Sequence, residues 1–470
     1  MKFIHTADWH LGNRMHQTGR IKEESDFLHW LKDYIITSKA DALFVAGDIF
    51  DTANPSVEAR QLYFNFLASL VGSCCQNVII VGGNHDSGML LDSQREILDC
   101  LNIHVTGSLS NNSLEKMIVD LYSTDSEGKR KIAGICCALP FVRESELRLF
   151  YDGKDEDGSF SDKAYEKLYK KLLEKAKERQ KEILEQGLGI EKNTKVPLFA
   201  TGHLYAADLE GRPFIENESS SLEKIDDGVR SLDIAGNLGS VHAGVFPKEF
   251  DYVALGHIHY CTRVGKNPKI RYSGSPFVMG FDEAHIERKI ILVECSENGG
   301  EVKSSLETVP AFVKYKRLSG SVSSIKKDLL KLIENICQGI EKGDEEAKKE
   351  YRLELYYQKS EGLNPDEAFS DLIEKLPENV RVISRKIMKS PSFYRAENIE
   401  LDGDELRSLD STEIYRNLIL SKIERNEEFK SEEEKIKWEE EQINKYLPYF
   451  IEVENFVKKG MCSENENTED

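Results

Sequence analysis

Short apolar runs alternate with longer amphipathic stretches over residues 1 to about 285. Each run has the length of a strand, and several are continuously apolar, as in a sheet that is covered on both faces. The stretches between them, such as 22–38 and 57–71, are typical of helices. This alternation predicts an α/β fold. The strand-like runs are FIHTA, DALFVAGD, NVIIVGGN, PLFATGH and DYVALGHIH.

The pattern also indicates how the chain is organised. A charged segment at 160–187 has a helical composition, and we expect it to be an exposed excursion. Strand and helix patterns at 312–388 predict a small α+β domain. We therefore expect three parts, which are 1–310 with a helical insertion at about 160–190, an α+β domain at 311–400, and a helical segment at 401–470 with a disordered end.

Composition and charge exclude several classes of protein. With 40% apolar and 31% charged residues, the 470-residue chain is not wholly disordered. Its 63 Lys and Arg against 83 Asp and Glu give a net charge of −20, which argues against binding nucleic acid by bulk charge alone.

Targeting signals and cysteine usage indicate the compartment. No apolar run reaches the roughly 18 residues of a membrane span, and no signal peptide is apparent. Nine Cys without a C-x-x-C motif argue against a disulfide framework. We therefore expect a cytoplasmic protein that does not bind membranes.

Five of the apolar runs end in the same way, with Ala or Gly followed by a side chain that can bind a metal. These side chains are Asp8, Asp48, Asn84, His203 and His257. Ligands of open α/β sheets gather outside the carboxyl ends of the strands, and a small residue lets the backbone approach closely. His10 and His259 follow two positions after Asp8 and His257, so an extended backbone would return both side chains of each pair to one side.

These seven candidates suit Mn²⁺, Fe or Zn²⁺, because they offer oxygen and imidazole ligands without thiolates. They are too many for one four-coordinate ion but enough for two ions if one carboxylate bridges. Two such ions form a clamp for in-line displacement at phosphorus. Asp8 and Asp48 would neutralise only half of the charge of two divalent ions, and the rest would attract a phosphodiester.

His85 is the histidine left over in these motifs. It directly follows Asn84, so its side chain points elsewhere and is well placed to contact the substrate. Because an imidazole exchanges protons near neutral pH, His85 is a candidate general acid for the leaving oxygen. Asp51, three residues after Asp48, could orient this imidazole or its water. The other histidines lack this context and are interpreted as structural or surface residues; they are His5, His16, His29, His104, His242 and His285.

The series D-x-H, GD-x-x-D, GNHD, GH and GHIH resembles the calcineurin-like metallophosphoesterases. The resemblance implies a four-layer α/β/β/α sandwich with a two-metal site at the strand ends. It further implies that one ion is held by Asp8, His10 and His259 and the other by Asn84, His203 and His257. Asp48 would bridge the ions and His85 would be the catalytic histidine. Archaeal and eukaryotic relatives usually have His where this chain has Asp51, so the orienting partner of His85 stays open.

Longer motifs, including HTADWHLG, VAGDIFDTANPS and RYSGSP, resemble the SbcD branch, the nuclease subunits of bacterial SbcCD complexes. That resemblance implies a Mn²⁺-dependent DNA nuclease in repair and recombination. It would act as an ATP-dependent double-strand exonuclease and a single-strand or hairpin endonuclease. The domain at 311–400 would cap the active site and help present DNA.

The resemblance also implies partners. The ATPase would be an SbcC-like coiled-coil subunit, because this chain has no G-x-x-x-x-G-K-[ST] loop. The C-terminal helices would bind that subunit, and the chain would be a homodimer within a heterotetramer.

Two alternatives stay open. One is a metallophosphoesterase that acts on a nucleotide, a small phosphodiester or a phosphoprotein. The capping domain and helical tail argue against it. The other is a non-catalytic subunit that tethers DNA ends, against which the full set of ligands argues.

Overall fold

The structure is a computed structural model. It describes residues 1–109, 113–124, 128–151, 160–187, 195–207, 214–215, 241–265, 267–296, 301–358, 365–388 and 438. Contacts divide the chain into two compact units, and the first comprises residues 1–319, 323–355 and 364–385. The helical segment predicted at 401–470 lies outside the described residues apart from Trp438. Among the described helices, none combines the length and apolar character that a membrane crossing requires.

The first sheet has six strands in the order β17-β16-β1-β4-β5-β6. Its parallel part confirms three of the predicted strands, β1, β4 and β5, and adds β6. The chain returns to this sheet late, when β16 pairs antiparallel with β1. The strands are β1 (Lys2–Thr6), β4 (Ala42–Ala46), β5 (Asn77–Val81), β6 (Ile103–Thr106), β16 (Lys289–Cys295) and β17 (Val302–Thr308).

The second sheet has seven strands in the order β11-β14-β15-β13-β9-β8-β7. Its centre confirms the two other predicted strands, β9 and β13, which pair in parallel. The strands are β7 (Ile118–Thr124), β8 (Arg130–Cys137), β9 (Leu198–His203), β11 (Phe214–Ile215), β13 (Tyr252–Gly256), β14 (Thr262–Arg263) and β15 (Ile270–Tyr272).

The two sheets pack face to face through a shared apolar core. Phe3 stacks on Phe44 within the first sheet, with ring centroids 4.4 Å apart, and meets Phe199 of the second sheet at 5.1 Å. On its other face the first sheet packs against helices α1 (Ile21–Ser38) and α2 (Val57–Leu70), which confirm the predicted helices. Both faces of the strands are therefore buried, which is why their sequences are continuously apolar.

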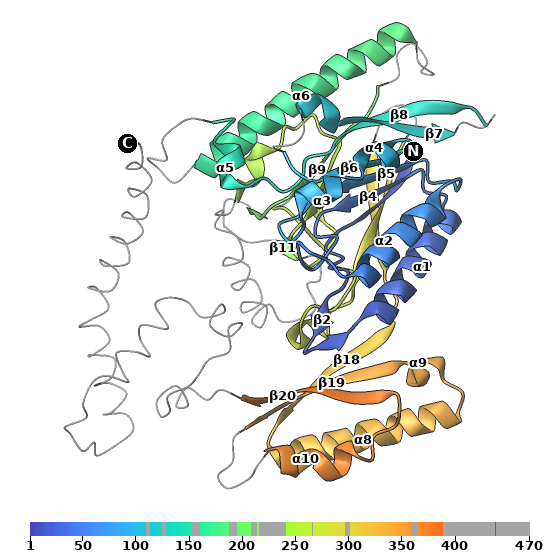
Figure 1. Cartoon of the computed structure of the whole chain (residues 1–470), viewed down its shortest axis with the longest axis vertical. Coiled ribbons are helices and arrows are strands. Elements are labelled where there is room, and N and C mark those ends of the chain that lie inside the picture. Colours follow the sequence, from blue (N-terminus) through green and yellow to red (C-terminus); the bar gives the residue numbers. More distant parts are fainter. Residues whose placement is uncertain are drawn as a thin grey trace. The chain divides into compact units, whose positions relative to one another are not determined.

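Helix α6 (Phe160–Gln186) covers the outer face of the second sheet, on the opposite side of the sandwich from α1 and α2 (Figure 1). The predicted helix is confirmed, but the prediction that it is an exposed excursion is wrong. Tyr165, Leu168, Tyr169 and Leu172 are buried and recur at helical spacing, so they form one apolar stripe against the sheet. With this helix the four layers are α, β, β and α, as the resemblance implied.

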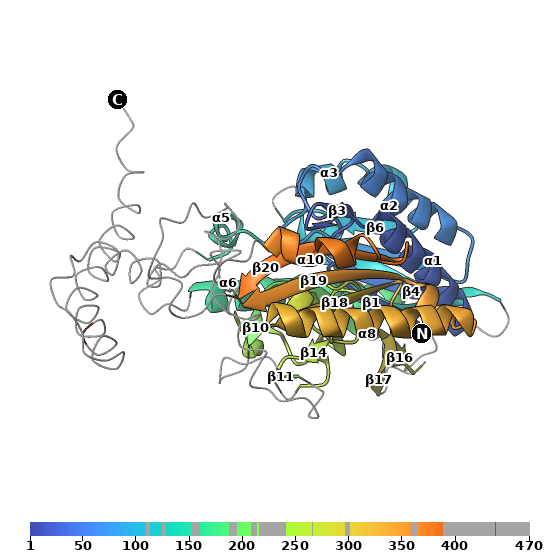
Figure 2. The same ribbon diagram turned by 90° about the horizontal axis from the view of Figure 1, so that it is seen from below.

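A three-stranded sheet in the order β18-β19-β20 follows the sandwich along the chain. Figure 2 shows it from below with α8 and α10. The two helices and two of the strands predicted within 312–388 are confirmed. The elements are β18 (Val313–Gly320), α8 (Val322–Glu341), α9 (Glu345–Lys348), β19 (Glu350–Gln358), α10 (Pro365–Ile373) and β20 (Val380–Met388). We refer to β18, β19 and β20 as the small sheet.

The remaining described elements are short. They are β2 (Arg14–Met15), β3 (Thr18–Gly19), β10 (Ala206–Ala207), β12 (Val241–His242), α3 (Gly88–Asp92), α4 (Arg95–Asp99), α5 (Glu144–Leu147), η1 (Leu114–Met117), η4 (Ala243–Val245) and η5 (Phe281–Glu283). The candidate site lies in the loops after β1, β4, β5 and β13 and at His203, the last residue of β9.

Candidate metal centre

The backbone at the strand ends is strongly bent. Asp8, His10, Asp48 and His257 have φ angles of 53°, 44°, 48° and 101°, in the left-handed region that residues other than glycine rarely adopt. The expectation of an extended D-x-H backbone is therefore wrong. Two hydrogen bonds hold the bend, because the amides of Asp8 and His10 donate to the carbonyls of Gly47 (2.9 Å) and Asp48 (3.0 Å). Such strain is typical of functional sites.

The small residues before the ligands allow the close approach that the sequence predicts. A Cβ atom on Gly83 would lie 2.1 Å from Oδ1 of Asp48, and one on Gly256 would lie 1.9 Å from the carbonyl oxygen of Ala46. Neither distance is possible for real atoms, so only glycine lets these loops meet.

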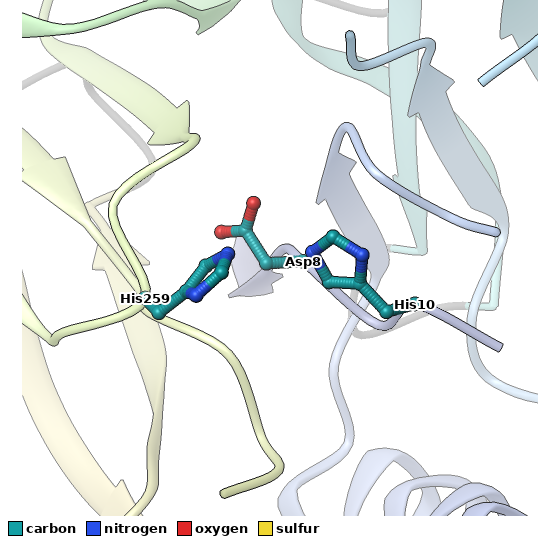
Figure 3. A group of neighbouring side chains, drawn as sticks. All are labelled: Asp8, His10 and His259. Atoms are coloured by element: carbon teal, nitrogen blue, oxygen red, sulfur yellow. The ribbon is translucent and has the colours of Figure 1, made fainter. Parts of the chain in front are cut away.

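Asp8, His10 and His259 form the first cluster of possible ligands, with one ligand atom from each lying within 4.8 Å of the others. They come from the loops after β1 and β13, and Figure 3 shows Asp8 between the rings of His259 and His10. Oδ1 of Asp8 accepts from the amide of His257 at 2.9 Å. Its Oδ2, however, is buried without a hydrogen-bond partner among the described residues, as is Nε2 of His10. Buried polar atoms without partners are costly, so the donor set fits a divalent cation.

The second cluster contains Asp8, Asp48 and His203, again within 4.8 Å. Nδ1 of His203 lies 2.9 Å from the carbonyl oxygen of Ala46 and must donate to it. Its Nε2 faces two oxygens, Oδ1 of Asn84 at 2.9 Å and Oδ2 of Asp48 at 3.4 Å. Oδ1 of Asn84 also lies 3.0 Å from Nδ1 of His257. Several lone pairs of these oxygen and nitrogen atoms face one another, so a proton or a cation is required between them.

Asp48 lies between the two clusters. Its Oδ2 is 3.6 Å from Nε2 of His10 and 3.4 Å from Nε2 of His203, while its Oδ1 accepts from the amide of His85 at 2.9 Å. A carboxylate that bridges two ions needs this central position. The structure thus brings all seven predicted ligands into one region, and their assignment to individual ions stays a proposal.

Buried charges compete for protons in this cluster. Burial raises the pKa of Asp8 to about 7, against the lowering effect of His203. Burial would lower the pKa of His203, but the Asp48 carboxylate outweighs it and raises the pKa to about 9. Burial, together with the charge of His203, lowers the pKa of His257 to about 3. Metal binding therefore competes with protons at Asp8 and His203, whereas the lowered pKa of His257 favours its neutral form, which can bind a metal.

His85 lies at the edge of the cluster with an exposed side chain. Its ring meets the His10 ring nearly at a right angle, with centroids 4.9 Å apart. Its Nδ1 donates to the backbone carbonyl of Asp51 at 2.9 Å, which leaves Nε2 as the atom available to a substrate. The Asp51 carboxylate instead faces His10, with Oδ1 3.5 Å from Nδ1. Asp51 thus makes its hydrogen bond to His85 through its main chain, while its carboxylate lies within 4.8 Å of ring nitrogens of both His10 and His85.

Sequence reasoning missed Asp86, the last residue of GNHD. Its carboxylate is buried and accepts from the amides of Ile49 (3.0 Å), Phe50 (2.9 Å) and Gly83 (2.8 Å). It therefore ties the loop after β4 to the loop after β5, and so places Asp48 relative to Asn84. The sequence feature that could have indicated this role is the acidic residue at the end of the GNHD motif.

Replacing Asp86 by Ala is expected to lower the free energy of unfolding by about 2–4 kcal/mol, because three buried amides lose their acceptor. It should also weaken Mn²⁺ binding, since the two loops are no longer tied. Asp251 is the matched control, because it accepts from the Leu198 amide at the opposite ends of β9 and β13. Asp251→Ala should lower the melting temperature only. Equal Mn²⁺ affinity in both variants would contradict this role of Asp86.

Three of the other histidines have structural contacts. His5 is buried, with its ring nitrogens 3.0 Å from Oη of Tyr252 and 3.1 Å from the carbonyl oxygen of Leu255. His104 contacts Asp99, and His242 accepts from the amide of Gly244. These contacts agree with the interpretation of these residues as structural.

Comparisons with known proteins agree with this geometry. The model of the calcineurin-like phosphoesterase family matches residues 1–261. The D component of the SbcCD nuclease from Escherichia coli strain K12 is 30% identical over 70% of this chain and 73% of its own length. The corresponding component from Rhodobacter capsulatus is 29% identical over 63% of this chain and 66% of its own length. The component from Bacillus subtilis is 26% identical over 68% of this chain and 73% of its own length.

The family match spans the five strands and the candidate ligands at their ends, which are Asp8, Asp48, Asn84, His203 and His257. The four-layer sandwich around these loops has the fold that such a match requires. This chain therefore belongs to the calcineurin-like phosphoesterases, in the SbcD branch of nucleases.

Proposed function

We propose that this chain is a two-metal DNA nuclease that acts with an ATPase partner. Its reactions would be ATP-dependent exonuclease cleavage of double strands and endonuclease cleavage of single strands and hairpins. One observation carries the proposal. Oδ2 of Asp8 and Nε2 of His10 are buried without hydrogen-bond partners among the described residues, beside the Asp48 carboxylate that lies between two histidines.

In this proposal, seven residues are metal ligands and one residue is a proton donor. Asp8, His10 and His259 would hold one ion, Asn84, His203 and His257 the other, and Asp48 both. Two divalent ions, when bound, polarise a phosphodiester and lower the pKa of a bound water. His203 is held in place by its bond to Ala46, a contact that fixes the tautomer of a ligating imidazole.

His85 supplies the proton in this proposal. Because Nδ1 is committed to the carbonyl of Asp51, Nε2 is the atom that would give a proton to the leaving oxygen. Its exposed position at the edge of the cluster leaves room for a polymer substrate.

Mn²⁺ is the proposed metal, since carboxylate, amide and imidazole ligands without thiolates suit it. The proposed partner is an SbcC-like coiled-coil ATPase, bound through the helices predicted at 401–470, with two copies of this chain in a heterotetramer. The names of the curated relatives, each the D component of an SbcCD nuclease, support this part of the proposal. The domain proposed at 311–400 would cap the active site.

A nuclease assay tests the proposal. The purified chain with Mn²⁺ should cleave single-stranded and hairpin DNA, and a co-purified ATPase partner with ATP should add cleavage of blunt double strands. Omitting Mn²⁺ should abolish both. Activity on a small chromogenic phosphodiester but none on DNA would favour the small-molecule alternative. A chain that binds no Mn²⁺ would favour the tethering alternative.

A further inference from the structure

A series of polar contacts leads away from the candidate metal ligands. It begins at Asp51, whose Oδ1 lies 3.5 Å from Nδ1 of His10 and accepts from Nδ2 of Asn13 at 2.8 Å. The same residue accepts from His85 through its carbonyl. Anything that moves Asp51 therefore moves its contacts with both His10 and His85.

Asn13 continues the series to Arg20. Its Oδ1 accepts from Nη1 of Arg20 at 3.3 Å, while its Nδ2 donates to Asp51. Both ends of the amide are thus in use, and only one orientation of the side chain satisfies both contacts. Aspartate could not replace it, because its oxygen would face the Asp51 carboxylate.

Arg20 is almost completely buried, with 1% of its surface exposed. Its guanidinium bonds Glu23 through Nε (2.9 Å) and Nη2 (3.2 Å), and Nη1 also donates to the carbonyl of Val278 at 2.7 Å. It lies 5.3 Å from the ring centroid of Tyr315. Because a buried guanidinium with this many partners is fixed in one position, Arg20 connects Asn13 rigidly to Glu23.

The series ends on the small sheet. Oη of Tyr315, on β18, donates to Oε2 of Glu23 at 2.8 Å. Arg352, on β19, donates to the same hydroxyl at 3.1 Å and to the carbonyl of Gly19 at 3.2 Å. All of these residues belong to the first compact unit. The small sheet is therefore joined to His10 by consecutive polar contacts through Tyr315, Glu23, Arg20, Asn13 and Asp51.

We propose that Asn13 and Arg20 are positioning residues that couple the small sheet to the ion held by His10. Neither residue would touch the substrate. They hold the Asp51 carboxylate 3.5 Å from Nδ1 of His10, an electrostatic contact longer than a hydrogen bond. This contact would favour the ring orientation in which Nε2 points toward Asp48, 3.6 Å away, where the ion would bind. Partners of this kind typically change metal affinity by about 10–100-fold when removed. The inference rests on the proposed function, because it requires a metal at His10.

The test measures Mn²⁺ affinity of the full chain by electron paramagnetic resonance titration, with melting temperatures in parallel. Asn13→Ala should weaken the binding of one ion about 10-fold and leave the other unchanged. Tyr315→Phe keeps the ring over Arg20 but loses the hydroxyl and its two hydrogen bonds, with Glu23 and Arg352. It should weaken the same ion about 2–5-fold, because only part of that loss is transmitted to His10. Tyr165→Phe is the matched control, because its buried hydroxyl donates to Val142 outside the series, and it should bind Mn²⁺ normally.

The double variant distinguishes coupling from two separate effects. If Tyr315 acts through Asn13, the variant with both changes should bind Mn²⁺ no more weakly than Asn13→Ala alone. If the fold-losses of Mn²⁺ affinity in the two single variants multiply in the double variant, the coupling is contradicted. Unchanged Mn²⁺ affinity in Asn13→Ala would contradict the positioning role. A wild-type chain that binds no Mn²⁺ would instead contradict the proposed function.

Discussion

Asp48→Ala is expected to lose both metal ions and to reduce DNA cleavage by at least about 10³-fold, since metal ions contribute several kcal/mol to such reactions. The reason is the central position of Asp48, whose Oδ2 lies within 3.6 Å of His10 and 3.4 Å of His203. Elemental analysis of the purified variant measures the metal content. The alanine side chain leaves the amide of His85 without its acceptor, so the fold should be checked by its melting temperature.

Asn84→Ala is the matched comparison. Its Oδ1 contacts only His203 and His257 of the candidate ligands, so its loss should weaken mainly one ion. If Asp48→Ala retained two ions, Asp48 would not be a bridge, and the division of the ligands into two sets would have to be redrawn.

His85→Ala is expected to keep both ions and DNA binding but to lose about 10²–10⁴-fold of the cleavage rate, the usual contribution of a general acid or base. The side chain is exposed, so the melting temperature should stay unchanged. Single-turnover cleavage with saturating Mn²⁺ measures the chemical step without product release.

His29 provides the control for His85, because it is also an exposed histidine with a contact to a backbone carbonyl, that of Ser25. His29→Ala should cleave DNA at the wild-type rate. A rate within a few-fold of wild type for His85→Ala would mean that this histidine only supports the loop. A lower melting temperature would point to the same conclusion.

Local patterns in the sequence were sufficient to predict most of the helices and strands. Strands β4 and β13, around Phe44 and Val253, are apolar and buried on both faces, which a sheet between two layers explains, and the sandwich has those layers. Helix α6 shows what a local pattern could not predict. Its composition predicts a helix, but the surface that covers Tyr169 comes from Thr201 of β9 and from Phe246 and Phe250, which are distant in the sequence.

The candidate ligands could also be found from the sequence, because a strand, a small residue and a ligand follow one another within a few positions. Which ligands meet was decided by the tertiary structure. Asn84 and His203 are 119 positions apart, yet their side chains lie 2.9 Å from each other, because β5 and β9 end at the same side of the two sheets. No local pattern contains that pairing.

The sequence by itself determined the residue types, the strands they follow and the family that they resemble. The tertiary structure decided the backbone at Asp8 and His10, where contacts with the loop after β4 impose left-handed angles that local preference disfavours. It also decided that Asp51 presents its carbonyl to His85 and its carboxylate to His10. The physical reason is the same in both cases: hydrogen bonds between segments far apart in the chain outweigh the preference of each segment alone.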